Sequence, residues 1–167
     1  DLAIQRFAEL RLHEAVQEYG AGGGRIVVMD CQTGELLAVA DVEREPTGIQ
    51  PRLRRNRCVT DPYEPGSTFK PFVWAAATEA GLATPDETLP TPSNGPHRTS
   101  FGRSIRDAHY HGPTTWRMVL VKSLNSGMAI VAERMKRDDL RSLVAQLGFG
   151  QSTNCGIPGE TGGIVTS

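Results

Sequence analysis

The chain opens with a hydrophobic pattern of helical period. Apolar residues recur about every 3.6 positions within residues 1–19, and charged residues lie between them. The apolar positions are Leu2, Phe7, Leu10, Ala15 and Val16. Four glycines between positions 20 and 24 interrupt the pattern. We therefore expect an amphipathic helix over residues 1–19.

Two short apolar runs follow, at residues 25–30 and 35–40. The four residues between them, Cys31-Gln32-Thr33-Gly34, contain the glycine typical of a hairpin connection. The pattern predicts an antiparallel hairpin. A helix packed on a hairpin begins an α+β fold, in which helices flank an antiparallel sheet.

Residues 41–62 are polar and rich in proline, and we expect a loop there. The run from Thr68 to Leu82 is rich in alanine and predicts a helix. Pro71 fits only within its first turn, which places the helix start near Ser67. Apolar residues cover much of this helix, so we expect it to be largely buried. They are Phe69, Phe72, Val73, Ala76, Ala77 and Ala80.

A second loop-rich stretch, residues 83–113, precedes three more expected helices. These helices span residues 116–122, 127–136 and 140–147, and residues 123–126 form a break between the first helix and the second. Thr114 or Thr115 would cap the first helix, and Asp138 or Asp139 would cap the third, which ends at Gly148. We expect residues 63–150 to form a mainly helical part, after the helix and hairpin of residues 1–41 and before a Gly-rich loop over residues 151–167.

Charge and composition exclude several classes of protein. The net charge of −1 gives no whole-chain reason for binding nucleic acid. Four arginines between positions 52 and 57 could bind an anionic partner, although a solvated loop face is the favoured interpretation. They are Arg52, Arg54, Arg55 and Arg57. No apolar run approaches the about 20 residues that cross a bilayer.

Metal and disulfide chemistry have weak support in the sequence. Cys31, Cys58 and Cys155 are far apart, and their odd number leaves open one pair plus one free thiol. His109 and His111 could ligate a metal from a strand, but no carboxylate or cysteine pattern accompanies them. We expect neither a metal nor another cofactor.

The chemistry-bearing residues begin with Ser67 and Lys70. They are three positions apart at a helix start, where side chains at i and i+3 share a face. A lysine amine that loses its proton can activate a serine for attack on a carbonyl. Ser123 and Asn125 form a second polar cluster, which could equally be an ordinary helix-breaking turn. Lys70 would need burial or a nearby cation to lower its pKa.

The string Tyr63-Glu64-Pro65-Gly66-Ser67-Thr68-Phe69-Lys70-Pro71 resembles the first active-site motif of the penicillin-binding protein transpeptidases, most closely the monofunctional class B enzymes. Ser123-Leu124-Asn125 resembles their second motif in its S-x-N form. The segment from Asp30 to Ala38, Gly148-Phe149-Gly150 and the residues from Gly156 to Gly163 resemble further stretches in the same order.

The resemblance implies a role for each matching residue. Ser67 would be the nucleophile that forms the acyl-enzyme, and its N–H would supply half of the oxyanion hole. Lys70 would be the general base, Ser123 a proton shuttle and Asn125 a substrate ligand. The reaction would cleave the D-Ala–D-Ala bond of a peptidoglycan stem peptide and pass the acyl group to an amine of a neighbouring stem. β-Lactams would acylate the same serine.

The resemblance also implies partners and a location. Stem peptides of lipid-linked precursor and glycan strands would be substrates, and a glycosyltransferase with divisome or elongasome membrane proteins would be partners. The domain would lie on the periplasmic face of the bacterial inner membrane, anchored by a segment before Asp1.

The chain departs from the family pattern in one respect, because it contains no K-T-G triplet. We expect a domain cut before its final strands, and inactive by itself. A non-catalytic sensor or structural module, a serine β-lactamase and a chance motif are the alternatives.

Overall fold

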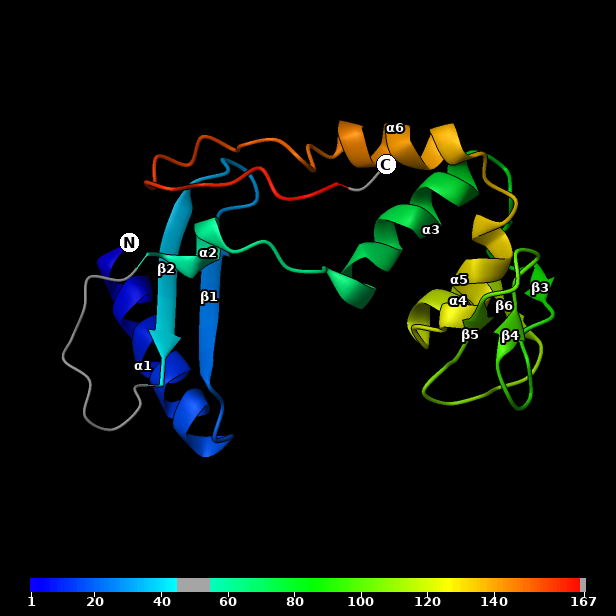
Figure 1. Cartoon of the computed structure of the whole chain (residues 1–167), viewed down its shortest axis with the longest axis horizontal. Helices are drawn as coiled ribbons and strands as arrows, with labels where there is room; N and C mark the ends of the chain where they lie inside the picture. Colours follow the sequence, from blue (N-terminus) through cyan, green and yellow to red (C-terminus); the bar gives the residue numbers. More distant parts are fainter. Residues whose placement is uncertain (45–54, 166–167) are drawn as a thin grey trace. The chain divides into compact units, whose positions relative to one another are not determined.

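The computed structural model describes residues 1–44 and 55–165. These residues form two compact units (Figure 1). The first contains residues 1–63 and the segment from residue 149 onward, and the second contains residues 64–148. Among the described residues, no helix combines the length and the apolar character needed to cross a membrane.

The first unit is a helix on a two-stranded antiparallel sheet. Helix α1 spans Leu2–Glu18, strand β1 Gly23–Met29, strand β2 Leu36–Glu43 and the short helix α2 Arg57–Thr60. The core lies between α1 and the sheet and consists of Ala8, Leu12, Val16, Ala38 and Ala40. The expected helix and hairpin are therefore confirmed, whereas α2 lies within the segment that we expected to be a loop.

Local chemistry explains why α1 begins where it does. Asp1 is its N-cap, and the Asp1 carboxylate accepts hydrogen bonds from the N–H groups of Ala3 and Ile4 at 2.8 and 3.0 Å. These bonds satisfy donors that the first helical turn leaves free. The Gln5 side chain also bonds both backbone groups of Val39 on β2, which fixes the helix against the sheet.

The second unit carries most of the helices. Its elements are the 3₁₀ turn η1 (Gly66–Phe69), α3 (Lys70–Glu79), β3 (Thr88–Leu89), β4 (His97–Arg98), β5 (Ser104–Ile105), β6 (Thr114–Thr115), α4 (Trp116–Val121), α5 (Asn125–Ala132) and α6 (Arg137–Gln146). Strand β3 pairs with β6, and β4 pairs with β5, both antiparallel. These two-residue ladders lie in or beside the stretch 83–113, where the sequence indicated only a loop.

The core of the second unit lies between α3, α4 and α5. Trp116, Val119 and Val131 are fully buried there. The rings of Trp74 and Trp116 stack with centroids 5.8 Å apart. Each indole N–H donates a hydrogen bond within the same cluster, Trp74 to the carbonyl of Trp116 and Trp116 to Thr78. The stacked pair joins α3 to the start of α4.

Several helix details differ from the sequence-based expectations. Only Ala77 of α3 is buried, and Phe72 is 43% exposed, so the expectation of a largely buried helix is wrong for this chain. One face of α3 meets α4 and α5, and the apolar residues outside that face remain exposed. The α4 helix and its Thr115 cap are confirmed.

The last two helices are shifted from their expected bounds. Helix α5 begins at Asn125 and ends at Ala132, so Asn125 belongs to its first turn and not to the break. Lys136 is the N-cap of α6, which makes the expected caps wrong; Asp138 and Asp139 lie in the first turn instead. Carboxylates there still interact favourably with the helix dipole. Gly148 follows α6 with a φ of 78°, as expected for a glycine that ends a helix.

The described cysteines and histidines form no metal centre. Cys31, Cys58 and Cys155 are all free thiols. Within residues 1–44 and 55–165, no three His, Cys, Asp or Glu side chains lie close enough together to hold a metal ion.

Candidate active site

Ser67 lies in the turn that leads into α3. Gly66 adopts a φ of 58°, a left-handed conformation that favours glycine, and the chain then enters η1. Thr68 Oγ1 donates to the carbonyl of Pro65 at 2.5 Å and closes the turn. Pro71 occupies the first turn of α3, where its missing N–H leaves no bond unmade. Ser67 is exposed, at the N-terminal end of a continuous helical segment.

Lys70 connects this turn to the second polar cluster. Its Nζ lies 2.6 Å from the backbone oxygen of Ser123, 3.0 Å from Ser123 Oγ and 2.6 Å from Asn125 Oδ1. More than 50 positions of sequence separate Lys70 from these partners. The structure therefore brings together three of the four residues singled out from the sequence, and the fourth, Ser67, lies one helical turn before Lys70.

The three oxygens around Lys70 define what the amine can do. An ammonium group has three N–H donors, and each has an acceptor here. A neutral amine would keep two donors and gain a lone pair. The two carbonyl-type oxygens can only accept, so the lone pair would face a hydroxyl, which can also donate. Ser123 Oγ is thus the partner that can exchange a proton with Lys70.

Ser67 Oγ and Lys70 Nζ are not joined by a hydrogen bond in the part of the chain that the structure describes. The amine is directed at Ser123 and Asn125 instead. Catalytic hydrogen bonds in unliganded enzymes are often long or poorly aligned and shorten in the substrate complex. Transfer from Ser67 to Lys70 stays a prediction, and it requires the amine to move toward Ser67.

The backbone at Ser123 is held in an uncommon conformation. Its φ is 53°, one of two positive values at non-glycine residues in the described chain. This conformation lets one residue present both its carbonyl oxygen and its hydroxyl to the same amine. A serine in the left-handed region costs roughly 1–2 kcal/mol, and such strain persists where surrounding contacts hold it.

Burial lowers the pKa of Lys70 below its ordinary value of 10.5, and the negative charge of Asp107 partly opposes this shift. A lowered pKa raises the fraction of neutral amine at a given pH, which a general base requires. The direction agrees with the requirement stated from the sequence. Nearby on the same segment, Phe69 and Phe72 contact each other with ring centroids 5.8 Å apart, and Phe72 is exposed.

Two residues behind the site were missed by sequence reasoning, Asp107 and Ser126. Both are buried, and the Asp107 carboxylate accepts hydrogen bonds from the Ser126 N–H at 2.9 Å and from the Ser126 hydroxyl. The adjacent carbonyl of Arg106 accepts from Asn125 Nδ2 at 2.8 Å. No signal in the sequence pointed to this pair, because the expected start of the helix at residue 127 hid the fact that Leu124, which cannot cap a helix, precedes it.

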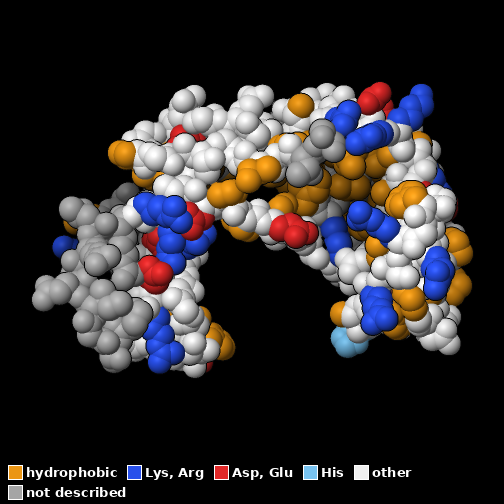
Figure 2. All heavy atoms as spheres, in the orientation of Figure 1, with side chains coloured by type: hydrophobic (Ala, Val, Ile, Leu, Met, Phe, Trp, Pro, Cys, Tyr) orange, Lys and Arg blue, Asp and Glu red, His pale blue; other side chains and the backbone are white. Residues whose placement is uncertain are grey.

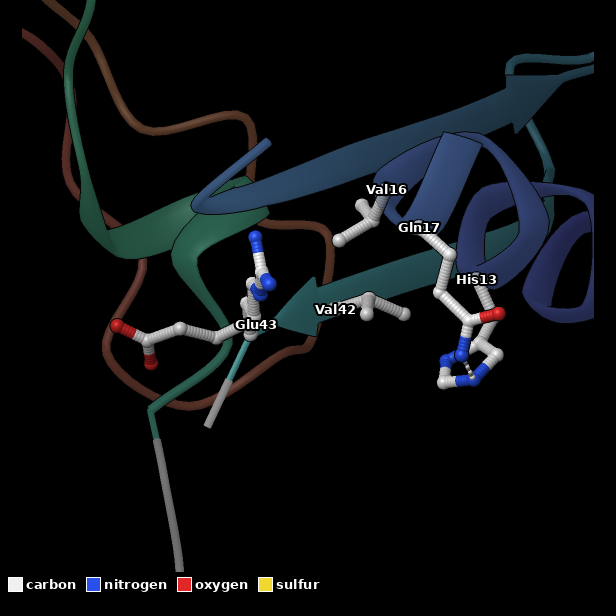
Figure 3. A pocket seen from close by; sticks show the side chains of 6 residues that line it. His13, Val16, Gln17, Val42 and Glu43 are labelled. Atoms are coloured by element: carbon white, nitrogen blue, oxygen red, sulfur yellow. Dashed lines mark hydrogen bonds between the residues drawn. The ribbon is translucent and has the colours of Figure 1, made fainter. Parts of the chain in front are cut away.

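A separate hollow of about 430 Å³ lies in the first unit (Figure 3). It is lined by His13, Val16, Gln17, Val42, Glu43 and Arg44. The His13 and Gln17 side chains are hydrogen-bonded, and Glu43 points away from them. This hollow contains none of the residues with predicted chemistry, so we do not assign the active site to it.

The four arginines between positions 52 and 57 are a candidate site for an anionic partner. Arg52 and Arg54 lie outside the described residues. Arg57 is partly buried and forms hydrogen bonds to Asp41 of 2.5–3.0 Å, and Arg55 lies 3.0 Å from Asp61. On the face drawn in Figure 2, basic and acidic side chains lie next to one another over this unit. The two described arginines are thus engaged within the protein itself.

Solved structures define the class of protein to which this fold corresponds. The transpeptidase domain of penicillin-binding protein 3 from Burkholderia pseudomallei superposes with a TM-score of 0.85 at 31% identity, over 100% of this chain and 46% of the other. Penicillin-binding protein 3 from Mycobacterium tuberculosis, complexed with ampicillin, gives a TM-score of 0.86 at 33% identity, over 100% of this chain and 38% of the other. The fold is that of a penicillin-binding protein transpeptidase domain.

Sequence comparison then identifies the family. The chain belongs to the penicillin binding protein transpeptidase domain family, whose pattern matches residues 24–167. It is 36% identical to the probable peptidoglycan D,D-transpeptidase PenA of Neisseria gonorrhoeae and 33% identical to the peptidoglycan D,D-transpeptidase FtsI of Escherichia coli. The matches cover 99% and 98% of this chain but only 28% of each relative.

Proposed function

We propose that the whole protein containing this chain is a peptidoglycan D,D-transpeptidase that acts through a serine acyl-enzyme. One observation carries the proposal: the amine of Lys70, one turn after Ser67, is held by three oxygens of the Ser123–Asn125 turn. The contacts join the two sequence motifs across more than 50 positions. A chance S-x-x-K sequence would not be expected to make them.

The first half-reaction forms the acyl-enzyme. Ser67 Oγ attacks the carbonyl carbon of the penultimate D-alanine of a stem peptide, while the Ser67 proton passes to Lys70. The carbonyl oxygen becomes an oxyanion beside the Ser67 N–H, at the positive end of the helical segment. The C–N bond then breaks, and the terminal D-alanine leaves as an amine that receives a proton. The product is an ester of Ser67.

Ser123 is the proton shuttle of this proposal. Its hydroxyl lies 3.0 Å from Lys70 Nζ and can accept a proton from the amine on one side and donate one on the other. In this way the proton taken from Ser67 reaches the leaving amine. Asn125 binds the substrate through its amide, after Nδ2 exchanges the Arg106 carbonyl for a substrate carbonyl.

The second half-reaction transfers the acyl group. An amine of a neighbouring stem peptide attacks the ester carbonyl and loses its proton through the same residues. An amide bond forms, the ester bond breaks, and Ser67 regains its proton. β-Lactams would acylate Ser67 when its hydroxyl attacks the carbonyl of the β-lactam ring and the ring opens. The crystal structure of the Mycobacterium tuberculosis relative in complex with ampicillin supports this part of the proposal.

The 167 residues by themselves are proposed to be inactive or nearly so. No lysine of the chain is followed by Thr or Ser and then Gly. In the family that the chain resembles, that motif supplies the site for the substrate carboxylate and the second oxyanion N–H. A site that lacks both would bind substrate weakly and leave the developing charge with half its donors.

The proposed setting follows the family. Stem peptides on lipid-linked precursor and glycan strands are the substrates, on the periplasmic face of the inner membrane, with a membrane anchor outside this chain. A glycosyltransferase and membrane proteins of division or elongation are the proposed partners. The family membership and the names of the peptidoglycan D,D-transpeptidase relatives support this setting.

The test supplies the purified whole protein with a synthetic peptide ending in D-Ala–D-Ala and an acceptor amine. We expect release of one D-alanine for each cross-linked product, and loss of both in Ser67→Ala. The same preparations are then mixed with nitrocefin. A burst of one turnover supports the transpeptidase, sustained hydrolysis would identify a β-lactamase, and neither reaction with any substrate would indicate a non-catalytic module.

A further inference from the structure

The N-terminus of helix α5 has no cap from its own sequence. Leu124 is the N-cap residue, and its side chain cannot accept a hydrogen bond. The first turn of a helix nevertheless leaves N–H groups that need partners. The need is acute here because Ser126, in that first turn, is fully buried and out of contact with water.

Asp107 supplies the missing cap from another segment of the chain. Oδ1 accepts from the Ser126 N–H at 2.9 Å, and Oδ2 accepts from the Ser126 hydroxyl. Asp107 is itself buried, with 9% of its surface exposed. A carboxylate at a helix N-terminus also interacts favourably with the helix dipole. The contact therefore fixes the position of the residue that directly follows Asn125.

The residues next to Asp107 and Ser126 also hold Asn125 and helix α5 in place. The Arg106 carbonyl accepts from Asn125 Nδ2, which turns Asn125 Oδ1 toward Lys70. The segment that carries Arg106 and Asp107 is also bound at the other end of α5, where the Glu133 carboxylate accepts from the N–H and hydroxyl of Ser100 at 2.6 and 3.0 Å. Glu133 is the C-cap of α5. The segment from Ser100 to Asp107 thus braces α5 at both ends.

We propose that Asp107 is a positioning residue of the site, which caps α5 from outside the helix and so holds Asn125 and Lys70 in their mutual contact. The inference deepens the proposed function and rests on it for its catalytic consequence. Asp107 does not touch Lys70 by a hydrogen bond and acts through Ser126, Asn125 and its charge.

The negative charge of Asp107 distinguishes a positioning residue from a purely structural one, because removing that charge should change the pKa of Lys70. The negative charge of Asp107 acts on Lys70 and opposes the lowering of the Lys70 pKa by burial. Replacing Asp107 by Asn keeps the shape and one acceptor oxygen for the Ser126 N–H, replaces the second acceptor by an NH₂ group that can donate to the Ser126 hydroxyl oxygen, and removes the charge. The pKa of Lys70 should then fall further.

The first experiment reads Lys70 directly. The whole protein is labelled at lysine with ¹³C and ¹⁵N, and the side-chain signal that disappears in Lys70→Arg is assigned to Lys70. We expect Asp107→Asn to move the Lys70 titration midpoint to lower pH. Asp86→Asn is the matched control, because Asp86 is an exposed carboxylate of the same unit that pairs with Arg117.

The second experiment measures acylation of Ser67 by a fluorescent penicillin in the whole protein as a function of pH. We expect Asp107→Ala to slow acylation about 100-fold, the scale of a small misplacement of catalytic groups. Asp107→Asn should shift the acidic limb of the profile to lower pH with a smaller loss of rate. Ser126→Ala should slow acylation without moving the limb, because it removes a hydrogen bond and no charge.

The outcomes separate this inference from the proposed function. An unchanged Lys70 midpoint in Asp107→Asn, or an Asp107→Ala rate within threefold of the parent, would overturn the role of Asp107. A parent protein that is never acylated at Ser67 would refute the proposed function. The lysine titration would in that case still decide whether Asp107 acts on Lys70.

Discussion

Gly127 on α5 allows a direct test of how closely this helix must approach α4. A β-carbon added at Gly127 would lie 2.3 Å from Val119 Cγ2 and 2.6 Å from Val119 Cγ1. Carbon atoms in contact are normally about 3.5–4.0 Å apart. Val119 is fully buried, and its β-branched side chain has one strongly preferred rotamer in a helix. It cannot turn aside without moving α4.

The magnitude follows from two opposing effects of Gly127→Ala. Alanine in a helix interior is favoured over glycine by about 1 kcal/mol. Forcing a methyl group into a packed core costs about 1–3 kcal/mol, and overlap with both γ-carbons places this case at the upper end. We therefore expect a net loss of about 2 kcal/mol in the free energy of unfolding.

Urea unfolding of the parent, Gly127→Ala, Val119→Ala and the double variant provides the measurement. In the Val119→Ala background both clashing γ-carbons are gone and only the β-carbon of residue 119, 3.0 Å from the added methyl group, remains, so Gly127→Ala should there cost much less stability than in the parent. Because Asn125 lies two positions earlier, the single variant should also slow acylation in the whole protein. A Gly127→Ala midpoint equal to or above that of the parent would refute the close approach of α4 and α5.

Three further predictions concern backbone strain and the charged groups. Ser123→Gly should be more stable than Ser123→Ala by roughly 1 kcal/mol in urea, because glycine adopts a φ of 53° without strain, and equal midpoints would contradict this. For Asp41, burial raises the pKa, but the hydrogen bonds and charge of Arg57 outweigh this effect and hold the pKa below 3.8. The Asp41–Arg57 pair therefore stabilises the fold above pH 3.8, and the stability lost in Asp41→Asn should shrink as urea unfolding is repeated at pH values falling through the folded pKa. A loss that stays constant with pH would argue against the pair. The pKa of Glu160 is lowered from 4.5 to about 2, chiefly by the hydrogen bond from the Thr153 hydroxyl. Its stabilising contribution is present above pH 4.5 and is lost as the pH falls through about 2. In an NMR titration, Thr153→Ala should move the Glu160 midpoint toward 4.5, and an unmoved midpoint would exclude the Thr153 hydroxyl as the cause.

Hydrophobic periodicity was sufficient to predict much of the fold. Helix α1, the β1–β2 hairpin and α4 carry the periods and caps that their local sequences require. The short ladders β3–β6 and β4–β5 were not predictable, because two-residue strands contain no measurable period. The exposure of Phe72 depends on which surfaces of α3 meet α4 and α5, and that is a property of packing.

The candidate site also has a part that the sequence predicted and a part that only the structure showed. Ser67, Lys70, Ser123 and Asn125 were found because their spacing and the surrounding string carry information. Asp107 was not found, since a cap supplied from another segment leaves no spacing pattern in the sequence. That Leu124 occupies the N-cap position became evident only from the structure. The direction of Lys70 toward Ser123 and Asn125 likewise required coordinates.

The most direct test of the central claim is the site of acylation. The whole protein is treated with penicillin, digested, and each peptide is weighed by mass spectrometry. We predict one penicilloyl group per molecule, carried by the peptide that contains Ser67, with the adduct absent in Ser67→Ala and formed far more slowly in Lys70→Met. An adduct on another residue, or one that forms at the parent rate without Lys70, would contradict the assignment of Ser67 and Lys70 as nucleophile and base.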